Sequence, residues 1–447
     1  MFQRNALDYL KQWAKKSGRK PLVLRGARQV GKTTLVHEFS KDFDQYLYLN
    51  LERQGATQLF ETNADLDQIL TSIYLFCNQP RSQNKTLLFI DEIQQSPKAV
   101  ALLRYFYEDF PEIYVVAAGS LLESLIDSHF SFPVGRVEYF ALRPCSFSEF
   151  LGAMGENELT KAINLTAVPE TIHGKVMQLF KTFTLVGGMP EIINHYAQNK
   201  DLVSIRDIYE SLLNGYKDDV EKYSRNNATT HIIRFILQQG WAFAAQRITL
   251  GSFAGSSYKS REMGEAFRTL EKTMLLELVY PCTQTLLPAY PELKRSPKLL
   301  WLDVGLVNYA AGIQNEIFNA ADIMDTWRGS IAEQIVAQEL LVFDNKVSST
   351  RSFWVRDKKG ADAEVDFVVR LHDKLIPAEV KSGHNSRLRS LHIFMENTNH
   401  DIAVRVWSQP FSVDELVTSS GKKFRLLNIP FYYVAELDKI LNKILTQ

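Results

Sequence analysis

The sequence has few cysteines, no net charge and no long apolar run. Its 447 residues include only three cysteines, Cys77, Cys145 and Cys282, which lie far apart. An odd number of scattered cysteines argues against a disulfide framework and against a cysteine-based metal site. The 51 basic and 51 acidic side chains cancel, so no global charge attracts nucleic acid, although a local basic groove is compatible with this balance.

Membrane and targeting signals are also absent from the pattern. No stretch approaches the roughly 18 apolar residues that a membrane-spanning helix needs. Residues 1–20 are polar and predict an amphipathic helix, without the apolar core of a signal peptide. We therefore expect a cytoplasmic protein without a membrane partner. At roughly 100–200 residues per domain, the length allows two to four domains.

Residues 1–155 contain short apolar runs that alternate with helical patterns. Candidate strands lie at 21–25, 45–51, 86–90, 113–118 and 137–142, and candidate helices at 65–76 and 97–110. Continuous apolar strands separated by helices predict an α/β domain built on a buried parallel sheet.

Three further regions are expected after this domain. A capping box, Ser146 with Glu149, opens a helix. A helical, lid-like region over residues 156–225 follows and is broken at 187–190. Residues 226–315 have the helix, helix, helix, β-ribbon order of a winged helix, although the candidate recognition helix at 260–276 carries acidic as well as basic side chains. Residues 316–447 predict a second α/β unit, with a helix at 331–343 and strands at 352–356, 363–369, 375–380 and 402–407.

A phosphate-binding loop is predicted at residues 26–33, Gly-Ala-Arg-Gln-Val-Gly-Lys-Thr, between a strand and a helix. Its glycines let the backbone curl so that N–H groups face the phosphates, and the helix N-terminus adds positive charge. Lys32 is expected to reach the β- and γ-phosphates of ATP, and the Thr33 hydroxyl to bind Mg²⁺. The predicted nucleotide-binding residues of the loop are Gly26, Gln29, Val30, Gly31, Lys32, Thr33 and Thr34.

Further residues complete the predicted nucleotide site. Asp91 ends an apolar strand and is expected to hold Mg²⁺, while Glu92 is expected to polarise the attacking water. Ser120, after the strand at 113–118, is a candidate sensor of the γ-phosphate. Arg136 is a candidate for stabilising transition-state charge, in its own chain or in a neighbouring copy, with a surface ion pair as the alternative.

Charged residues of the last region predict a second site. Glu364 and Asp366 lie in one predicted strand, and Glu379 and Lys381 lie in the next, across a tight turn. Alternate strand residues face the same side, so Glu379 and Lys381 are expected to lie near Asp366. With Glu333 from the preceding helix, Asp366 and Glu379 would bind Mg²⁺, and Lys381 would position a water for phosphodiester cleavage. A salt-bridged surface hairpin is the alternative.

These motifs resemble those of bacterial and archaeal AAA-superfamily ATPases that carry a C-terminal restriction-endonuclease-like domain of the PD-(D/E)XK type. The resemblance covers essentially the whole chain and rests on residues 24–34, 89–93, 119–120, 135–136, 143–149, 187–190, 301–306, 329–333, 364–367 and 379–382. It implies Mg-ATP binding, a winged-helix middle region and a nuclease-like C-terminal domain. Glu333, Asp366, Glu379 and Lys381 match the nuclease-core positions, whereas no Pro-Asp precedes the strand.

Two functional hypotheses follow from the sequence. The leading hypothesis is an ATPase coupled to metal-dependent cleavage or handling of DNA. The alternative is an ATP-dependent molecular switch whose C-terminal domain is a non-cleaving binding module for protein or nucleic acid; the neutral net charge and the acidic candidate recognition helix favour it. A nucleotide-dependent remodelling ring is a third possibility, and it requires a homo-oligomer.

Overall fold

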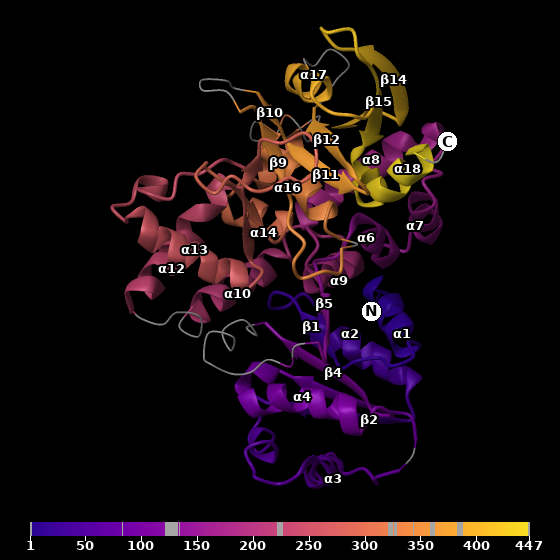
Figure 1. The fold of residues 1–447 in the computed structure, drawn as a ribbon, viewed down its shortest axis with the longest axis vertical. Coiled ribbons are helices and arrows are strands. Elements are labelled where there is room, and N and C mark those ends of the chain that lie inside the picture. The colour runs from indigo at the N-terminus through magenta and orange to yellow at the C-terminus, as the bar shows by residue number, and fades with distance from the viewer. Residues whose placement is uncertain are drawn as a thin grey trace.

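The computed structural model describes residues 2–82, 84–120, 133, 135–220, 227–320, 325, 329–342, 344–357, 363–381 and 388–445. Figure 1 shows the N-terminal α/β domain at the bottom, the C-terminal domain at the top and a largely helical region between and beside them. Short 3₁₀ turns occur at residues 40–42, 57–59, 93–95, 170–172, 240–243, 253–255 and 431–436.

The N-terminal domain is built on the parallel sheet that its apolar runs predict. The strands are β1 (Leu22–Arg25), β2 (Gln45–Asn50), β3 (Thr86–Asp91), β4 (Tyr114–Gly119) and β5 (Glu138–Ala141). They form one five-stranded sheet in the order β2-β3-β4-β1-β5, and each neighbouring pair is parallel. All five predicted strands are confirmed to within two residues at each end.

Helices cover both faces of this sheet, which is why its strands are apolar throughout. Helices α1 (Ala6–Ala14) and α2 (Lys32–Phe39) pack on one face, with strand residues such as Leu24 and Phe89. Helices α3 (Leu66–Phe76) and α4 (Pro97–Asp109) pack on the other face. Because all strands are parallel, the loops that follow β1, β3 and β4 meet at one edge of the sheet.

A helical region follows, as expected. It comprises α6 (Phe147–Ala153), α7 (Asn157–Asn164), α8 (His173–Val186), α9 (Pro190–Asn199) and α10 (Arg206–Asp218). The predicted capping box is present, because Ser146 accepts a hydrogen bond from the backbone N–H of Glu149 and the Glu149 carboxylate accepts one from that of Ser146. The predicted break at residues 187–190 is the turn between α8 and α9.

Among the described residues, the next region has two α-helices before its paired strands, where three helices were expected. Its elements are α12 (Asn227–Gln239), α13 (Ser260–Lys272), β6 (Leu276–Val279), β7 (Pro281–Cys282), β8 (Lys298–Trp301), α14 (Val304–Ala310) and α15 (Gln314–Asn319). Strands β6 and β8 pair antiparallel. Strand β7 pairs instead with β9 (Phe353–Val355), so one sheet crosses the predicted boundary at residue 315. The winged-helix assignment stays a prediction.

The C-terminal domain is α/β, but two of its predicted elements have different bounds. The predicted strand 363–369 is two strands, β10 (Glu364–Val365) and β11 (Phe367–Leu371), which separate at Asp366 because β10 pairs with β9 and β11 pairs with β12 (Lys374–Val380). The predicted helix 331–343 is α16 (Ser330–Glu339), so it ends earlier, and residue 343 lies outside the described residues.

The main C-terminal sheet contains strands that the sequence did not indicate. Its order is β11-β12-β13-β15-β14. Strand β13 (Ile402–Trp407) agrees with the prediction, whereas β14 (Ser412–Val417), β15 (Lys423–Pro430) and the helix α18 (Leu437–Leu445) were not predicted. Helix α17 (Arg389–Glu396) lies between β12 and β13 in the sequence.

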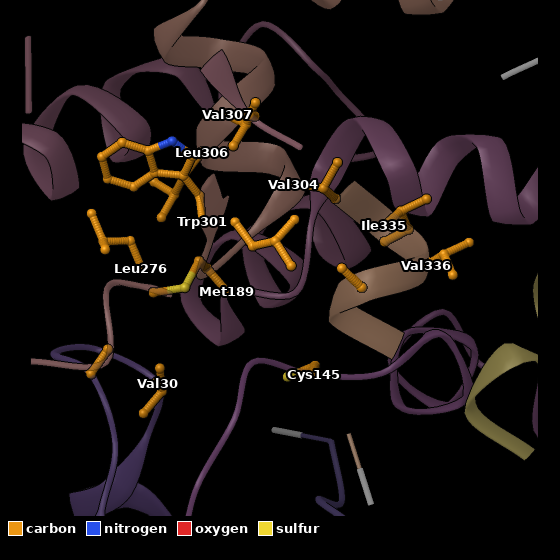
Figure 2. Packing of buried hydrophobic residues seen from close by; sticks show 14 of the residues in the cluster. Val30, Cys145, Met189, Leu276, Trp301, Val304, Leu306, Val307, Ile335 and Val336 are labelled. Carbon is orange, nitrogen blue, oxygen red and sulfur yellow. The ribbon is translucent and has the colours of Figure 1, made fainter. Parts of the chain in front are cut away.

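One apolar core joins all these regions. Figure 2 shows part of it, from Val30 in the loop after β1, past Met189 and Cys145, to Trp301 and then to Ile335 on α16. All three cysteines are free, as expected, and two of them are buried. No helix among the described residues is long and apolar enough to cross a bilayer.

A buried carboxylate fixes the regions to each other at the centre of this core. Asp303 caps α14 by accepting a hydrogen bond from the backbone N–H of Leu306 (3.0 Å), and it also accepts hydrogen bonds from the N–H of Gly188 (2.5 Å) and from the Gln338 side chain (3.3 Å). Gly187 has φ 69°, and a Cβ there would collide with the Asp303 carboxylate. The motifs at 187–190 and 301–306 are therefore explained by packing.

Candidate functional site

The predicted phosphate-binding loop connects β1 with α2 at the carboxyl edge of the sheet. Its backbone curls through left-handed conformations at Gln29 (φ 62°) and Gly31 (φ 91°). A Cβ at Gly26 would lie 2.6 Å from the carbonyl oxygen of Leu142. Glycine is therefore required at position 26 by close approach and favoured at position 31 by the backbone angle.

Lys32 lies under the loop with only 6% of its surface exposed. Its ammonium group donates hydrogen bonds to the carbonyl oxygens of Gly26 (2.9 Å) and Ala27 (2.8 Å). Burial lowers the pKa of this group to about 8, although the nearby charges of Glu92 and Asp91 oppose the shift. Lys32 is thus a buried cation whose partners are neutral oxygens, so an anion at the loop would be a better partner for it.

Thr33 and Asp91 meet at this edge. The Thr33 hydroxyl donates a hydrogen bond of 2.7 Å to the Asp91 carboxylate, which also accepts a bond of 3.4 Å from the Tyr48 hydroxyl. Glu92 has a left-handed backbone (φ 52°), and its carboxylate accepts a hydrogen bond from the Gln94 side chain. Such a conformation is uncommon outside glycine and occurs often at functional sites.

The other two predicted residues differ in their surroundings. Ser120 is 7% exposed and directly follows β4, which lies between the strand that precedes the loop and the strand that carries Asp91. Arg136 is on the surface, and its side chain pairs with Glu108 of α4 at 2.7 Å. From the sequence, such a surface ion pair was the alternative to a role in ATP hydrolysis. A role of Arg136 in the site of a neighbouring copy stays a prediction.

The phosphate-binding loop is also contacted by residues that precede α1 and by residues at the end of α10. The Arg4 side chain donates a hydrogen bond of 3.1 Å to the carbonyl of Val30. Tyr216, on α10, donates one of 3.2 Å to the carbonyl of Arg28, and the guanidinium group of Arg28 pairs with Asp219. The loop is therefore in direct contact with the helical region.

The predicted C-terminal cluster is also brought together. The side chains of Lys381 and Glu379 lie 3.3 Å apart, and the Asp366 carboxylate accepts a hydrogen bond of 2.8 Å from the backbone N–H of Val380. The pKa of Glu379 is raised to about 8 by burial first and by the charge of Asp366 second. Burial likewise raises the pKa of Glu333 to about 7, with Asp366 as the next cause. These acids are thus close enough to repel one another.

Lys298, the first residue of β8, also lies among these acids, although no sequence motif indicated that it belongs to the cluster. Its ammonium group is 3.0 Å from Glu333, 2.8 Å from Glu364 and 3.7 Å from Asp366. Burial alone lowers the pKa of Lys298, but the surrounding carboxylates outweigh burial and raise it. Within the described part of the chain, no three Asp, Glu, His or Cys side chains are grouped so that they could hold a metal ion.

Three regions of the chain match known family models. Residues 18–151 match a family described as an AAA domain. Residues 18–151 form an AAA-type P-loop ATPase domain. Domains of this class bind and hydrolyse ATP. Residues 177–317 and 328–424 match two families described as domains of unknown function (DUF8612 and DUF4143).

Comparison with curated proteins gave no match. Several solved structures are similar at low identity. The Walker-type ATPase PABY2304 of Pyrococcus abyssi is 14% identical (TM-score 0.41) and is matched over 70% of this chain and 96% of that one. The RuvB Holliday junction branch migration motor of Thermotoga maritima is 18% identical (TM-score 0.28; 62% and 90%). The Orc1 protein of Aeropyrum pernix in complex with DNA is 10% identical (TM-score 0.28; 70% and 93%). These scores are too low to support an argument about function.

The loop residues, Asp91, Glu92 and Ser120 lie at the carboxyl edge of the sheet, whereas Arg136 precedes β5 and lies at the opposite, amino edge. The outer contacts of the loop could not be found from the sequence. Arg4, Tyr216 and Asp219 lie in no motif, and each reaches the loop through the packing of another region. Lys298 begins an apolar strand, where a charged residue gives no signal of burial. Only the three-dimensional arrangement identifies these residues.

Proposed function

We propose that this chain is an ATP-dependent molecular switch whose C-terminal domain is a non-cleaving binding module for protein or nucleic acid. The observation that carries the proposal is the contact between the phosphate-binding loop and α10. Tyr216 and Asp219 bind the backbone and the side chain of Arg28, in the middle of the loop. A change in the loop is therefore transmitted directly to the helical region.

The residues of the ATPase domain fit Mg-ATP. Lys32 would exchange its bonds with the Gly26 and Ala27 carbonyls for bonds with phosphate oxygens. Thr33 and Asp91, already in contact, are placed to hold Mg²⁺, which when bound offsets negative charge on the phosphates. Glu92 would polarise the attacking water. To do so it would have to leave Gln94, so we propose that the Gln94 contact belongs to the resting state.

The coupling step is a rearrangement of the contact between the loop and α10. Phosphate binding to the loop adds negative charge close to Arg28, and this charge competes with Asp219 for the guanidinium group. Weakening the Arg28–Asp219 pair would release the end of α10, which precedes the region that contains α12 and α13. Nucleotide state then sets the position of the middle region, as in other switch proteins.

The non-cleaving part of the proposal is supported by Lys298. Metal-dependent cleavage needs carboxylates that are free to bind the ion. Here the ammonium group of Lys298 lies within 3.0 Å of both Glu333 and Glu364. Glu333, one of the predicted metal ligands, is thereby paired within the protein, and Asp366, another, lies 3.7 Å from the same ammonium group. The domain would act through what it binds, and not through hydrolysis.

A DNA incubation tests this proposal. Wild-type protein and the Lys381→Ala variant are incubated with linear, circular and single-stranded DNA, with ATP and either Mg²⁺ or Mn²⁺. We expect phosphate release from ATP and intact DNA in every condition. Cleavage by the wild type that is lost in Lys381→Ala would overturn the non-cleaving assignment.

The second candidate function is the coupled, metal-dependent nuclease that acts on DNA. It is favoured by the proximity of Asp366, Glu379 and Lys381, and by one buried oxygen of Glu379 that has no hydrogen-bond partner among the described residues. Such an oxygen is costly to bury unless something binds it. Cleavage in the experiment above would select this candidate.

A further inference from the structure

We propose that Lys298 is the resident cation of the C-terminal carboxylate cluster and takes the place that a divalent metal ion would otherwise have. The inference supports the non-cleaving part of the proposed function, but it concerns metal binding and is tested without DNA or ATP. The two proposals can therefore fail separately.

The first argument is the position of the ammonium group. It makes ion pairs with Glu333 from α16 and Glu364 from β10, and it lies 3.7 Å from Asp366 at the junction of β10 and β11. Acids from three different elements thus converge on one lysine. A divalent ion that used these same oxygens would have to lie within a few ångströms of this positive charge, which opposes its binding.

The second argument is that Lys298 is not free to move away. Its side chain is only 4% exposed, and the ring centre of Phe353 lies 5.0 Å from the ammonium group. Its backbone pairs with Val279 of β6 on one side and with Arg247 on the other. This backbone pairing on both sides fixes the Cα atom of Lys298 beside the cluster, and burial of the side chain keeps its ammonium group among the acids.

The third argument is charge balance. Four acids, Glu333, Glu364, Asp366 and Glu379, are gathered here, and unpaired buried carboxylates are strongly unfavourable. Lys298 and Lys381 provide two positive charges, and Arg247 lies 3.5 Å from Glu364. The protein thereby supplies positive charge of the kind that a metal ion would bring. A lysine from the middle region also joins that region to the C-terminal domain.

The decisive experiment is a Mn²⁺ titration of the nucleotide-free full chain, followed by electron paramagnetic resonance. The variants are Lys298→Met, which keeps the length of the side chain without its charge, and Lys294→Met, a control at an exposed lysine of the same segment. Each is also made with Asp366→Asn, so that binding at the cluster is separated from binding at Thr33 and Asp91.

We expect wild type and Lys294→Met to show no Mn²⁺ binding that depends on Asp366. Lys298→Met is expected to bind Mn²⁺ at the cluster roughly tenfold or more tightly than wild type does, because the competing charge is gone. Adding Asp366→Asn to Lys298→Met should remove this binding. Mn²⁺ should then raise the melting temperature of Lys298→Met more than that of wild type, and Asp366→Asn should remove this extra increase.

Asp366-dependent Mn²⁺ binding by the wild type would overturn the proposal, and this arm does not depend on whether Lys298→Met folds. A folded Lys298→Met protein that gains no site would overturn it as well.

Discussion

The hydroxyl group of Thr33 and the carboxylate of Asp91 are joined by a hydrogen bond of 2.7 Å. Thr33 is in the first turn of α2, and Asp91 is the last residue of β3. Two elements that are separate in the sequence thus place their oxygen atoms together, at the edge where the loop curls. The site is assembled by the sheet itself, so single substitutions should separate binding from hydrolysis.

Lys32→Ala and Glu92→Gln should affect ATP in different ways. Lys32→Ala removes the buried cation of the loop and should abolish nucleotide binding. Glu92→Gln should bind ATP normally but hydrolyse it on the order of 10²–10⁴ times more slowly, because the group that polarises the water is lost. Fluorescent-nucleotide binding and phosphate release measure the two effects, with the exposed Glu112→Gln as control. Unchanged hydrolysis by Glu92→Gln would remove Glu92 from its role.

Arg136→Ala tests whether this arginine acts on a neighbouring copy. Its ion pair with Glu108 is on the surface, where solvent and salt screen such pairs, so the pair should contribute little to the free energy of unfolding. If the pair is its whole role, both stability and ATP hydrolysis should be nearly unchanged. A large loss of hydrolysis, restored by mixing with a Lys32→Ala protein that supplies Arg136, would instead show action between copies.

Glu339 should make stability depend on pH. Its side chain lies 1% exposed between α16 and α6, and burial raises its pKa from 4.5 to about 8, although the Phe147 N–H opposes the shift. The folded protein therefore keeps a proton that the unfolded chain releases. This contribution is fully present below about pH 4.5 and is lost as the pH rises toward 8.

Urea unfolding across this pH range measures the effect. A single proton changes the free energy of unfolding by up to about 1.4 kcal/mol per pH unit. A glutamine cannot ionise, so Glu339→Gln should make the free energy of unfolding less dependent on pH. The buried Asp303, with a pKa of about 6, still contributes to the dependence below that pH. An identical pH slope in Glu339→Gln and wild type would contradict this assignment.

Asp303→Ala should be strongly destabilising. The substitution removes the cap of α14 and leaves the N–H of Gly188 and the amide of Gln338 without their acceptor, in a fully buried position. The combined loss of a cap and of buried hydrogen bonds corresponds to about 2–5 kcal/mol. Asp303→Asn keeps one acceptor and should cost less. Equal stability of Asp303→Ala and wild type would show that this carboxylate does not fix the regions together.

The parts of the fold that could be predicted are those determined by local sequence. The strands of the first sheet are buried on both faces, so each is a continuous apolar run, and the loop between β1 and α2 has a specific spacing of glycines and Lys32. The capping box at Ser146 is also local, because it links two residues one helical turn apart. Such features need no knowledge of the remaining chain.

The parts that could not be predicted depend on distant partners. The break at Asp366 arises because β10 and β11 join different sheets, which no local pattern records. Strand β14 lies at a sheet edge and no residue of it is buried, so it lacks an apolar run. Lys298 and Asp219 have roles only because other regions fold against them.

Hydrogen exchange of α10 tests the switch most directly. ATP is added to Glu92→Gln, which should hold the bound state, and to the same protein with Asp219→Asn or, as the matched control, with the exposed Asp218→Asn. We predict that ATP changes the exchange of residues 206–218 and of the middle region in Glu92→Gln and in the Asp218→Asn control, and that Asp219→Asn removes this change while ATP still binds. If ATP binds but every change stays within residues 18–151, the loop does not signal to the rest of the chain and the account is wrong.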